Sequence, residues 1–86
     1  MKYSCKDGYF KKGDILNIRI DRKVTIRLMN DINFMKFKNG QEYSYFGGEF
    51  SSSPVNLKVP KTDHWNIVFD LGGNTGILSY SIRVFK

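Results

Sequence analysis

The chain has 86 residues, and a chain of this length holds one hydrophobic core, because it buries little more than half of the surface that it exposes when unfolded. Seven Phe, five Tyr and one Trp supply apolar area for that core, which argues against a disordered protein. Fourteen Lys and Arg against eight Asp and Glu give a net charge of +6. This charge favours binding to polyanions, but charged side chains also serve to keep a protein soluble and to protect the edges of its sheets. We therefore predict one folded domain over residues 1–86.

The N-terminal residues Met1–Phe10 are too polar for a secretory signal, and no apolar run approaches membrane-spanning length. Cys5 is the only cysteine, so the chain forms neither an internal disulfide nor a cysteine-based zinc site. These features predict a cytoplasmic protein that has no membrane segment, no metal and no cofactor.

We interpret Tyr9–Phe10 as an edge strand. Two runs of alternating apolar and polar residues follow it. In Asp14–Ile20 and in Lys23–Met29, apolar residues recur at every second position, the period of a half-buried strand. Only Asp21 and Arg22 separate the two runs, a spacing typical of a hairpin turn. We expect these two strands to pair antiparallel.

The alternation stops over residues 30–40. Phe34 and Phe37 lie three positions apart there, with Asn33 ahead of them and Asn39–Gly40 behind as capping signals. This pattern predicts the only helix, a short turn whose two phenylalanines plug one end of the core.

Further strands are expected along the rest of the chain. Alternation resumes over Gln41–Phe46, and Gly47-Gly48 indicates a tight turn or bulge after it. Later strands are predicted at Val55–Val59, Trp65–Asp70 and Leu78–Val84, joined by the loop Ser51–Pro54, the turn Lys61–His64 and the glycine-rich corner Leu71–Gly76. Six to eight short strands with turns every eight to twelve residues predict an all-β fold, a small antiparallel β-sandwich of jelly-roll type.

A catalytic set is hard to assemble from this sequence. His64, the sole histidine, would have to act as the base for Cys5 or for a serine of Ser51–Ser53, with Asp63 or Asp70 orienting its ring. No local spacing supports such a triad, and a histidine beside a Trp at a strand start more often bonds a neighbouring loop. We predict no catalytic residue, no metal site and no enzyme, and a hydrolase stands last among the alternatives.

Two sets of residues remain as candidates for binding. The turns after Tyr45 and before Trp65 are expected at the same end of the sandwich, where loops cluster, and they define a candidate ligand site of Tyr43, Tyr45, Phe46, His64 and Trp65. A candidate anion site consists of Arg19, Arg27 and Arg83, because the first two lie on facing strands of the predicted hairpin. For both sets the alternative is a solvated sheet face with tyrosines half in the core.

An ordered series of short motifs spans nearly the whole chain, from Tyr9 to Val84. The motifs are Ile26–Asn30, Asn33-Phe34, Lys38–Gly40, Tyr45–Gly48, Ser53–Val55, Val59-Pro60, His64-Trp65 and Asp70–Gly73. Together they resemble the bacterial family catalogued as domain of unknown function 1883. The resemblance implies a compact β-sandwich that occurs alone or joined to other domains, including the Toll/interleukin-receptor (TIR) type of bacterial signalling and defence. It implies no catalytic residue.

The leading hypothesis is therefore a non-catalytic binding module, a sensor or adaptor of a bacterial signalling or defence system. Its partner would be a ligand or a protein, TIR-type proteins included, and its oligomeric state is left open. The alternatives are a small basic nucleic-acid or nucleotide-binding domain, whose affinity falls with salt, and a structural domain that oligomerises through an edge strand.

Overall fold

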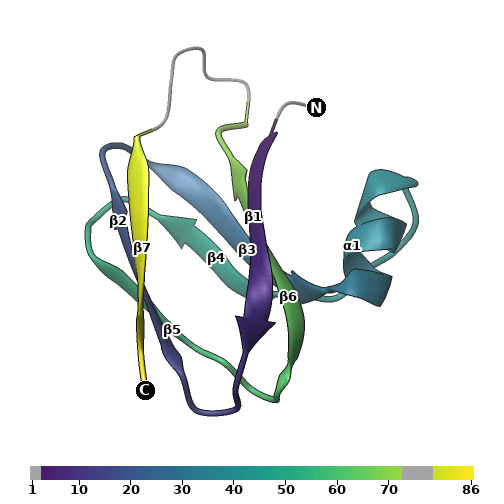
Figure 1. The fold of residues 1–86 in the computed structure, drawn as a ribbon. Coiled ribbons are helices and arrows are strands. Elements are labelled where there is room, and N and C mark those ends of the chain that lie inside the picture. The colour runs from purple at the N-terminus through teal and green to yellow at the C-terminus, as the bar shows by residue number, and fades with distance from the viewer. Residues whose placement is uncertain (1–2, 73–78) are drawn as a thin grey trace.

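The computed structural model describes residues 3–72 and 79–86, and this part of the chain forms seven β-strands and one α-helix. In chain order they are β1 (Tyr3–Phe10), β2 (Ile15–Ile20), β3 (Val24–Asn30), α1 (Asp31–Lys38), β4 (Phe46–Phe50), β5 (Val55–Lys58), β6 (Asp63–Asp70) and β7 (Tyr80–Phe85). The strands form two sheets, in the orders β1-β6-β3-β4 and β5-β2-β7, and every pair is antiparallel (Figure 1). The predicted antiparallel β-sandwich with one short helix is confirmed.

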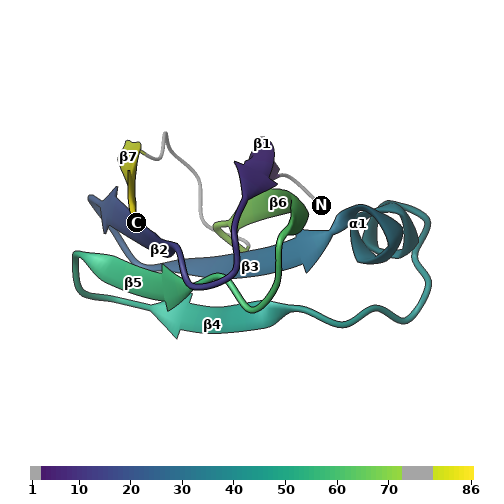
Figure 2. The same cartoon turned by 60° about the horizontal axis from the view of Figure 1, so that its bottom comes forward.

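The main core lies between the two sheets (Figure 2). Alternate residues of each strand point into this space, which is the reason for the two-residue period in the sequence. The buried members of this core are Leu16, Ile18, Val24, Ile26, Leu28, Val55, Val59, Trp65, Ile67 and Phe69.

The predicted hairpin of β2 and β3 is wrong. β2 pairs with β5 and β7, whereas β3 pairs with β4 and β6, so the short connection between β2 and β3 crosses from one sheet to the other. Both strands bury one apolar face against the same core, from opposite sides. Alternation specifies the buried face of a strand but not its hydrogen-bonded neighbour, and the short spacing alone does not distinguish a hairpin from a crossing.

The edge strand expected at Tyr9–Phe10 is much longer and covers the whole of β1. It lies at the edge of the four-stranded sheet and, among the described strands, pairs only with β6, in a register that places Tyr3 opposite Asp70 and Phe10 opposite Asp63. Its core-facing row begins with Ser4, Lys6 and Gly8, which lie opposite Phe69, Ile67 and Trp65. Because that row lacks an apolar pattern, the period of two does not reveal this strand.

The predicted helix is confirmed, but its position in the sandwich is not the expected one. The Asn30 side chain, not that of Asn33, caps it by accepting a hydrogen bond from the Asn33 backbone N–H at 3.0 Å. Phe34 and Phe37 do not plug an end of the main core. They pack with Met29, Val68 and Tyr43 in a second, smaller core on the outer face of the four-stranded sheet.

Residues 41–45 form no strand, which corrects the prediction for Gln41–Phe46. β4 begins at Phe46, and Gly47-Gly48, expected as a turn, lies inside it. Gly47 is opposite Arg27 and has φ of +128°, and an added Cβ would overlap the carbonyl oxygen of Ile26. The glycine is therefore required by the close approach of two strand backbones.

The remaining strands are close to their predicted positions. β6 begins at Asp63, inside the expected turn Lys61–His64, and β5 falls within the predicted range. Of the final predicted strand, Leu78 lies outside the described residues, as does most of the glycine-rich corner Leu71–Gly76. In the described part of the chain, no helix has the length and apolar composition to span a membrane.

Candidate functional site

His64 lies between two carboxylates on the outer face of the four-stranded sheet. Its Nδ1 is 2.6 Å from an Asp31 carboxylate oxygen and its Nε2 is 2.9 Å from one of Asp7. Asn66 donates a further hydrogen bond of 2.9 Å to Asp31, and the ring of Tyr9 lies 4.8 Å from the imidazole, centroid to centroid. We call His64, Asp7 and Asp31 the histidine cluster.

Each residue of the histidine cluster comes from a different element. His64 is near the start of β6, Asp7 is on β1, which pairs with β6, and Asp31 is in the first turn of α1. The bonds to Asp31 and then to Asp7 raise the pKa of His64. The bonds from Asn66 and then from His64 lower the pKa of Asp31. The cluster thus favours the protonated form of the imidazole and the ionised form of Asp31.

This arrangement differs from the triad considered from the sequence. Neither Asp63 nor Asp70 contacts the imidazole: the Asp63 carboxylate accepts a bond from the His64 backbone N–H, and Asp70 pairs with Arg27. Both ring nitrogens of His64 face carboxylates, so neither is directed at a thiol or a hydroxyl. Cys5 is exposed on β1, and partial burial of its sulfur, followed by the nearby Asp7, raises the pKa of its thiol. That environment is the opposite of what an activated cysteine needs.

Arg27 and Asp70 form a second charged group on the same outer face. A guanidinium nitrogen of Arg27 is 2.9 Å from an Asp70 carboxylate oxygen, and both side chains are mostly buried. The guanidinium also lies over the rings of Tyr45 and Phe37, at 5.5 and 6.0 Å. Burial acts to raise the pKa of Asp70, but the bonds from Arg27 and from the Gly72 N–H outweigh it and hold that pKa below its usual value. Arg27 therefore stabilises the fold, through its ion pair with Asp70 and its contacts with the two aromatic rings.

Three of the five residues in the candidate ligand site line one pocket. Tyr45, Phe46 and Trp65 border a cavity of about 390 Å³ at the end of the sandwich where β3 ends and β4 begins. The Phe46 ring meets Trp65 edge-on at 6.0 Å between centroids, and the Trp65 indole N–H donates to the Lys61 carbonyl at 3.0 Å. We call this cavity the aromatic pocket.

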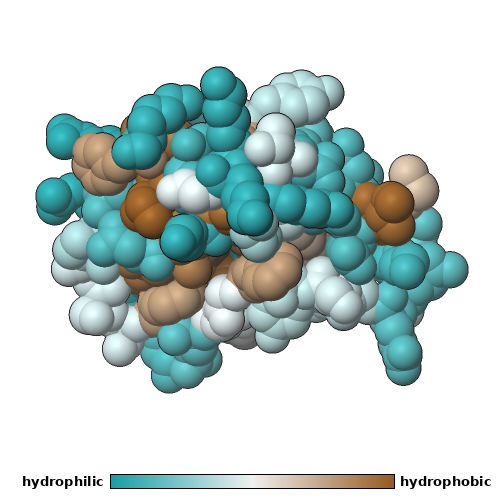
Figure 3. Space-filling model, turned by 90° about the horizontal axis from the view of Figure 1, so that it is seen from below, coloured by the Kyte–Doolittle hydropathy of each residue, from teal (hydrophilic) through white to brown (hydrophobic). Residues whose placement is uncertain are grey.

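The aromatic pocket has an apolar floor and a polar rim. Phe46 is 52% exposed and Tyr45 is 43% exposed, although both are large aromatic residues, whereas Trp65 is only 2% exposed and forms part of the floor. Polar groups on the lining come from Asn30, Asn33, Ser44 and Lys61. Seen from the end of the sandwich at which β6 begins, apolar patches lie among a mainly hydrophilic surface (Figure 3).

The other two residues of that candidate site lie elsewhere. Tyr43 is half-buried against Phe37, with 5.1 Å between ring centroids, and so belongs to the outer core. His64 precedes Trp65 on β6 and therefore points to the opposite face of the strand, into the histidine cluster. The sequence pattern does not identify Asp7 and Asp31 as partners of His64, because no fixed spacing indicates a contact that depends on strand pairing.

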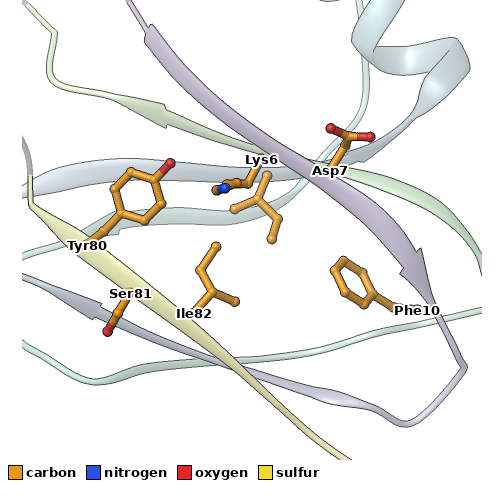
Figure 4. A pocket seen from close by; sticks show the side chains of 7 residues that line it. Lys6, Asp7, Phe10, Tyr80, Ser81 and Ile82 are labelled. Atoms are coloured by element: carbon orange, nitrogen blue, oxygen red, sulfur yellow. The ribbon is translucent and has the colours of Figure 1, made fainter.

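A second cavity, of about 270 Å³, lies between the unpaired edges of β1 and β7 (Figure 4). Phe10, Ile67 and Ile82 line it, and Lys6 extends from the core-facing side of β1 toward Tyr80. An inward-pointing charge on an edge strand is a common protection against edge-to-edge association, and the lysine stem covers apolar surface. Protection of the sheet edge therefore explains the inward position of Lys6, and no bound ligand is needed to explain it.

The three arginines of the candidate anion site do not share a face. Arg19 is on β2 and Arg83 is on β7, both exposed on the outer face of the three-stranded sheet. Arg27 belongs to the other sheet and is paired with Asp70. This corrects the expected grouping, and the reason is that β2 and β3 belong to different sheets.

Comparison with known proteins gives one match. The family model described as "Domain of unknown function (DUF1883)" matches residues 1–86. No curated protein and no solved structure matches the chain.

Proposed function

Since the chain belongs to the DUF1883 family, whose function is unknown, we propose a function from the site itself: a non-catalytic binding module that holds a small ligand in the aromatic pocket. The ligand has a flat apolar part and at least one hydrogen-bonding or anionic group. The observation that carries the proposal is the pairing of exposed Tyr45 and Phe46 with a pocket floored by Trp65.

The chemistry of the lining supports this class of ligand. Large aromatic side chains normally lose exposure on folding, so two exposed ones at the mouth of one cavity indicate a surface kept for binding. A volume of about 390 Å³ falls within the range of small-molecule sites, which combine apolar walls with a few polar groups. Asn30, Asn33 and Lys61 are polar residues of this lining. The amide oxygens of both asparagines are bonded within the protein and Lys61 pairs with Asp63, but their amide and ammonium groups keep further N–H donors.

Among the described residues, the position of the histidine cluster favours a binding role for the pocket. The acid and base groups of the histidine cluster are occupied by one another, and they lie on the opposite face of β6 from Trp65. The role of a sensor or adaptor in bacterial signalling or defence, with a TIR-type protein as partner, forms part of the same proposal. It rests on the family resemblance.

The experiment uses Trp65, the only tryptophan in the chain, as its reporter. Nucleoside monophosphates, cyclic dinucleotides and monosaccharides are screened by thermal shift, and each hit is titrated while the tryptophan emission is recorded. We expect at least one compound to raise the melting temperature and to change the emission with the same apparent Kd, since a ligand of the folded state stabilises it by mass action.

Two matched variants make the test specific. Phe46→Ala removes an exposed ring at the pocket and is expected to weaken binding about tenfold or more, since base–aromatic and similar stacking contacts have this size. Phe85→Ala removes a ring of similar exposure on the other sheet and should leave the Kd unchanged. If no compound in the screen moves both signals, or if both variants weaken binding equally, the proposed pocket is wrong.

A further inference from the structure

The outer face of the three-stranded sheet carries three cationic side chains, and the described strand residues on this face include no acidic one. In the described residues its outward row consists of Ile15, Asn17, Arg19, Asn56, Lys58, Ser81, Arg83 and Phe85, which we call the open face. Three of these residues are cationic, four are neutral hydrogen-bonding or aliphatic residues, and one is aromatic. No described helix or strand lies over this face, whereas α1 lies on the far side of the molecule (Figures 1 and 2).

The cations of the open face have no ion-pair partner among the described residues. Arg19, Lys58 and Arg83 are exposed, and none of them takes part in a salt bridge, while Arg22, Lys23, Arg27 and Lys61 each do. Asp21, at the β2–β3 connection, borders the same pocket as Arg19, but it accepts hydrogen bonds from the Ser79 N–H and from Arg22. The positive charge of the open face is therefore not neutralised by ion pairs within the described residues.

The strand register distributes these charges over all three strands. Arg83 on β7 lies opposite Asn17, and Arg19 is two residues further along β2, so these two arginines are diagonal neighbours about 7–8 Å apart. Lys58 lies on the far side of β2, on β5, opposite Ile15, so the cations extend across the face and can contact separate charges of a flexible anionic chain. Asn17 and Asn56, joined by a hydrogen bond of 2.8 Å, lie between them and offer further amide groups.

Phe85 adds a feature that simple attraction between charges does not require. It is 48% exposed and lies opposite Ile15, two residues from Arg83 on β7 and across β2 from Lys58. An exposed aromatic ring among cations is the combination by which sheet surfaces hold single strands, with side-chain cations on phosphates and a ring stacked on a base. We propose that the open face binds single-stranded nucleic acid, independently of the ligand in the aromatic pocket.

The test is fluorescence anisotropy of a labelled single-stranded thymidylate oligonucleotide with the full chain, at NaCl concentrations from 50 to 200 mM. Contacts to about three phosphates predict that log K falls with log salt with a slope of about −2. Arg19→Gln, Arg83→Gln and Lys58→Gln should each reduce the steepness by about 0.7. Phe85→Ala should lower the affinity about tenfold at every salt concentration and leave the slope unchanged.

Two controls separate this surface from general basicity and from other polyanions. Lys36→Gln removes the same charge from exposed α1 and should leave both affinity and slope unchanged. Equal losses in Lys36→Gln and Arg83→Gln would overturn the assignment to the open face. Equal affinity for a duplex of the same sequence, or for poly-glutamate, would overturn the assignment to single strands.

Discussion

The two outer faces of the sandwich use charge in opposite ways. On the outer face of the four-stranded sheet, Arg27 pairs with Asp70, and His64 is held between Asp7 and Asp31. On the open face of the three-stranded sheet, Arg19, Lys58 and Arg83 have none among the described residues. The contrast teaches that the charge of a side chain says little about its role until its partners are known, because the same residue types form ion pairs on one face and lack them on the other.

The largest effect on the free energy of unfolding is expected from a substitution in the outer core between α1 and the four-stranded sheet. Phe37 is 6% exposed and touches Tyr3, Phe34 and Tyr43, so Phe37→Ala should lower the free energy of unfolding by about 3–4 kcal/mol. Urea denaturation followed by circular dichroism measures the change. Phe85→Ala, on the open face, should cost less than about 1 kcal/mol. A large loss for Phe85→Ala would show that the open face is covered in solution.

The next effect concerns the buried ion pair. Asp70→Asn leaves the guanidinium of Arg27 partly buried without its counter-charge, and we expect a loss of about 3 kcal/mol in the free energy of unfolding. The double variant Arg27→Met with Asp70→Leu removes both charges and should recover much of that loss, because an apolar pair needs no compensation. A double variant as unstable as Asp70→Asn would mean that the pair is needed for its shape rather than its charge balance.

A smaller effect is expected from the histidine cluster, and it depends on pH. The pKa of His64 is raised in the folded state, so its stabilisation is complete below its ordinary pKa of about 6.5 and is lost as the pH rises through the raised value. The pKa of Asp31 is lowered, so its stabilisation is lost only as the pH falls through that lower value.

Melting temperatures measured between pH 5 and 9 test this window. The wild-type protein should lose stability as the pH rises past about 6.5, and His64→Gln should flatten that part of the profile. Arg19→Gln keeps the cluster intact and should retain the wild-type profile. An unchanged profile in His64→Gln would assign the pH dependence to other groups.

The smallest effect completes the comparison. Arg19→Gln and Arg83→Gln should each change the free energy of unfolding by less than about 0.5 kcal/mol, because they remove exposed charges that have no partner. Urea denaturation of both variants beside Asp70→Asn gives the measurement. A loss close to that of Asp70→Asn would place these arginines among the structural charges.

Alternation in the sequence predicts which face of a strand is buried, and this part of the prediction is confirmed for Leu16, Ile18, Ile26 and Leu28. It does not predict pairing, because the same apolar row suits a strand in either sheet. β1 was largely missed because its core-facing row holds Ser4, Lys6 and Gly8 beside the unpaired edge of the sandwich.

The candidate site divides in the same way. The sequence predicts that Tyr45, Phe46 and Trp65 meet, and they line one pocket, but the reason is that β4 and β6 begin at the same end of their sheet, since the turn expected at Gly47-Gly48 lies inside β4. The contacts of His64 with Asp7 and Asp31 depend on the β1–β6 register and on where α1 docks, neither of which leaves a local pattern.

The order of strand pairing also affects how the chain folds. β1 aligns Tyr3 with Asp70, and β2 takes its partners from β5 and β7, so nearly all of the sheet pairing joins distant parts of the chain. During synthesis, β1 therefore waits for almost the entire domain to be made before it finds its neighbour. Folds dominated by such distant pairings form slowly, and the early strands spend that time with open edges. In a nascent chain, the charge of Lys6 disfavours association of the unpaired β1 with other strands. In the folded protein, the same side chain protects the edge of the sandwich.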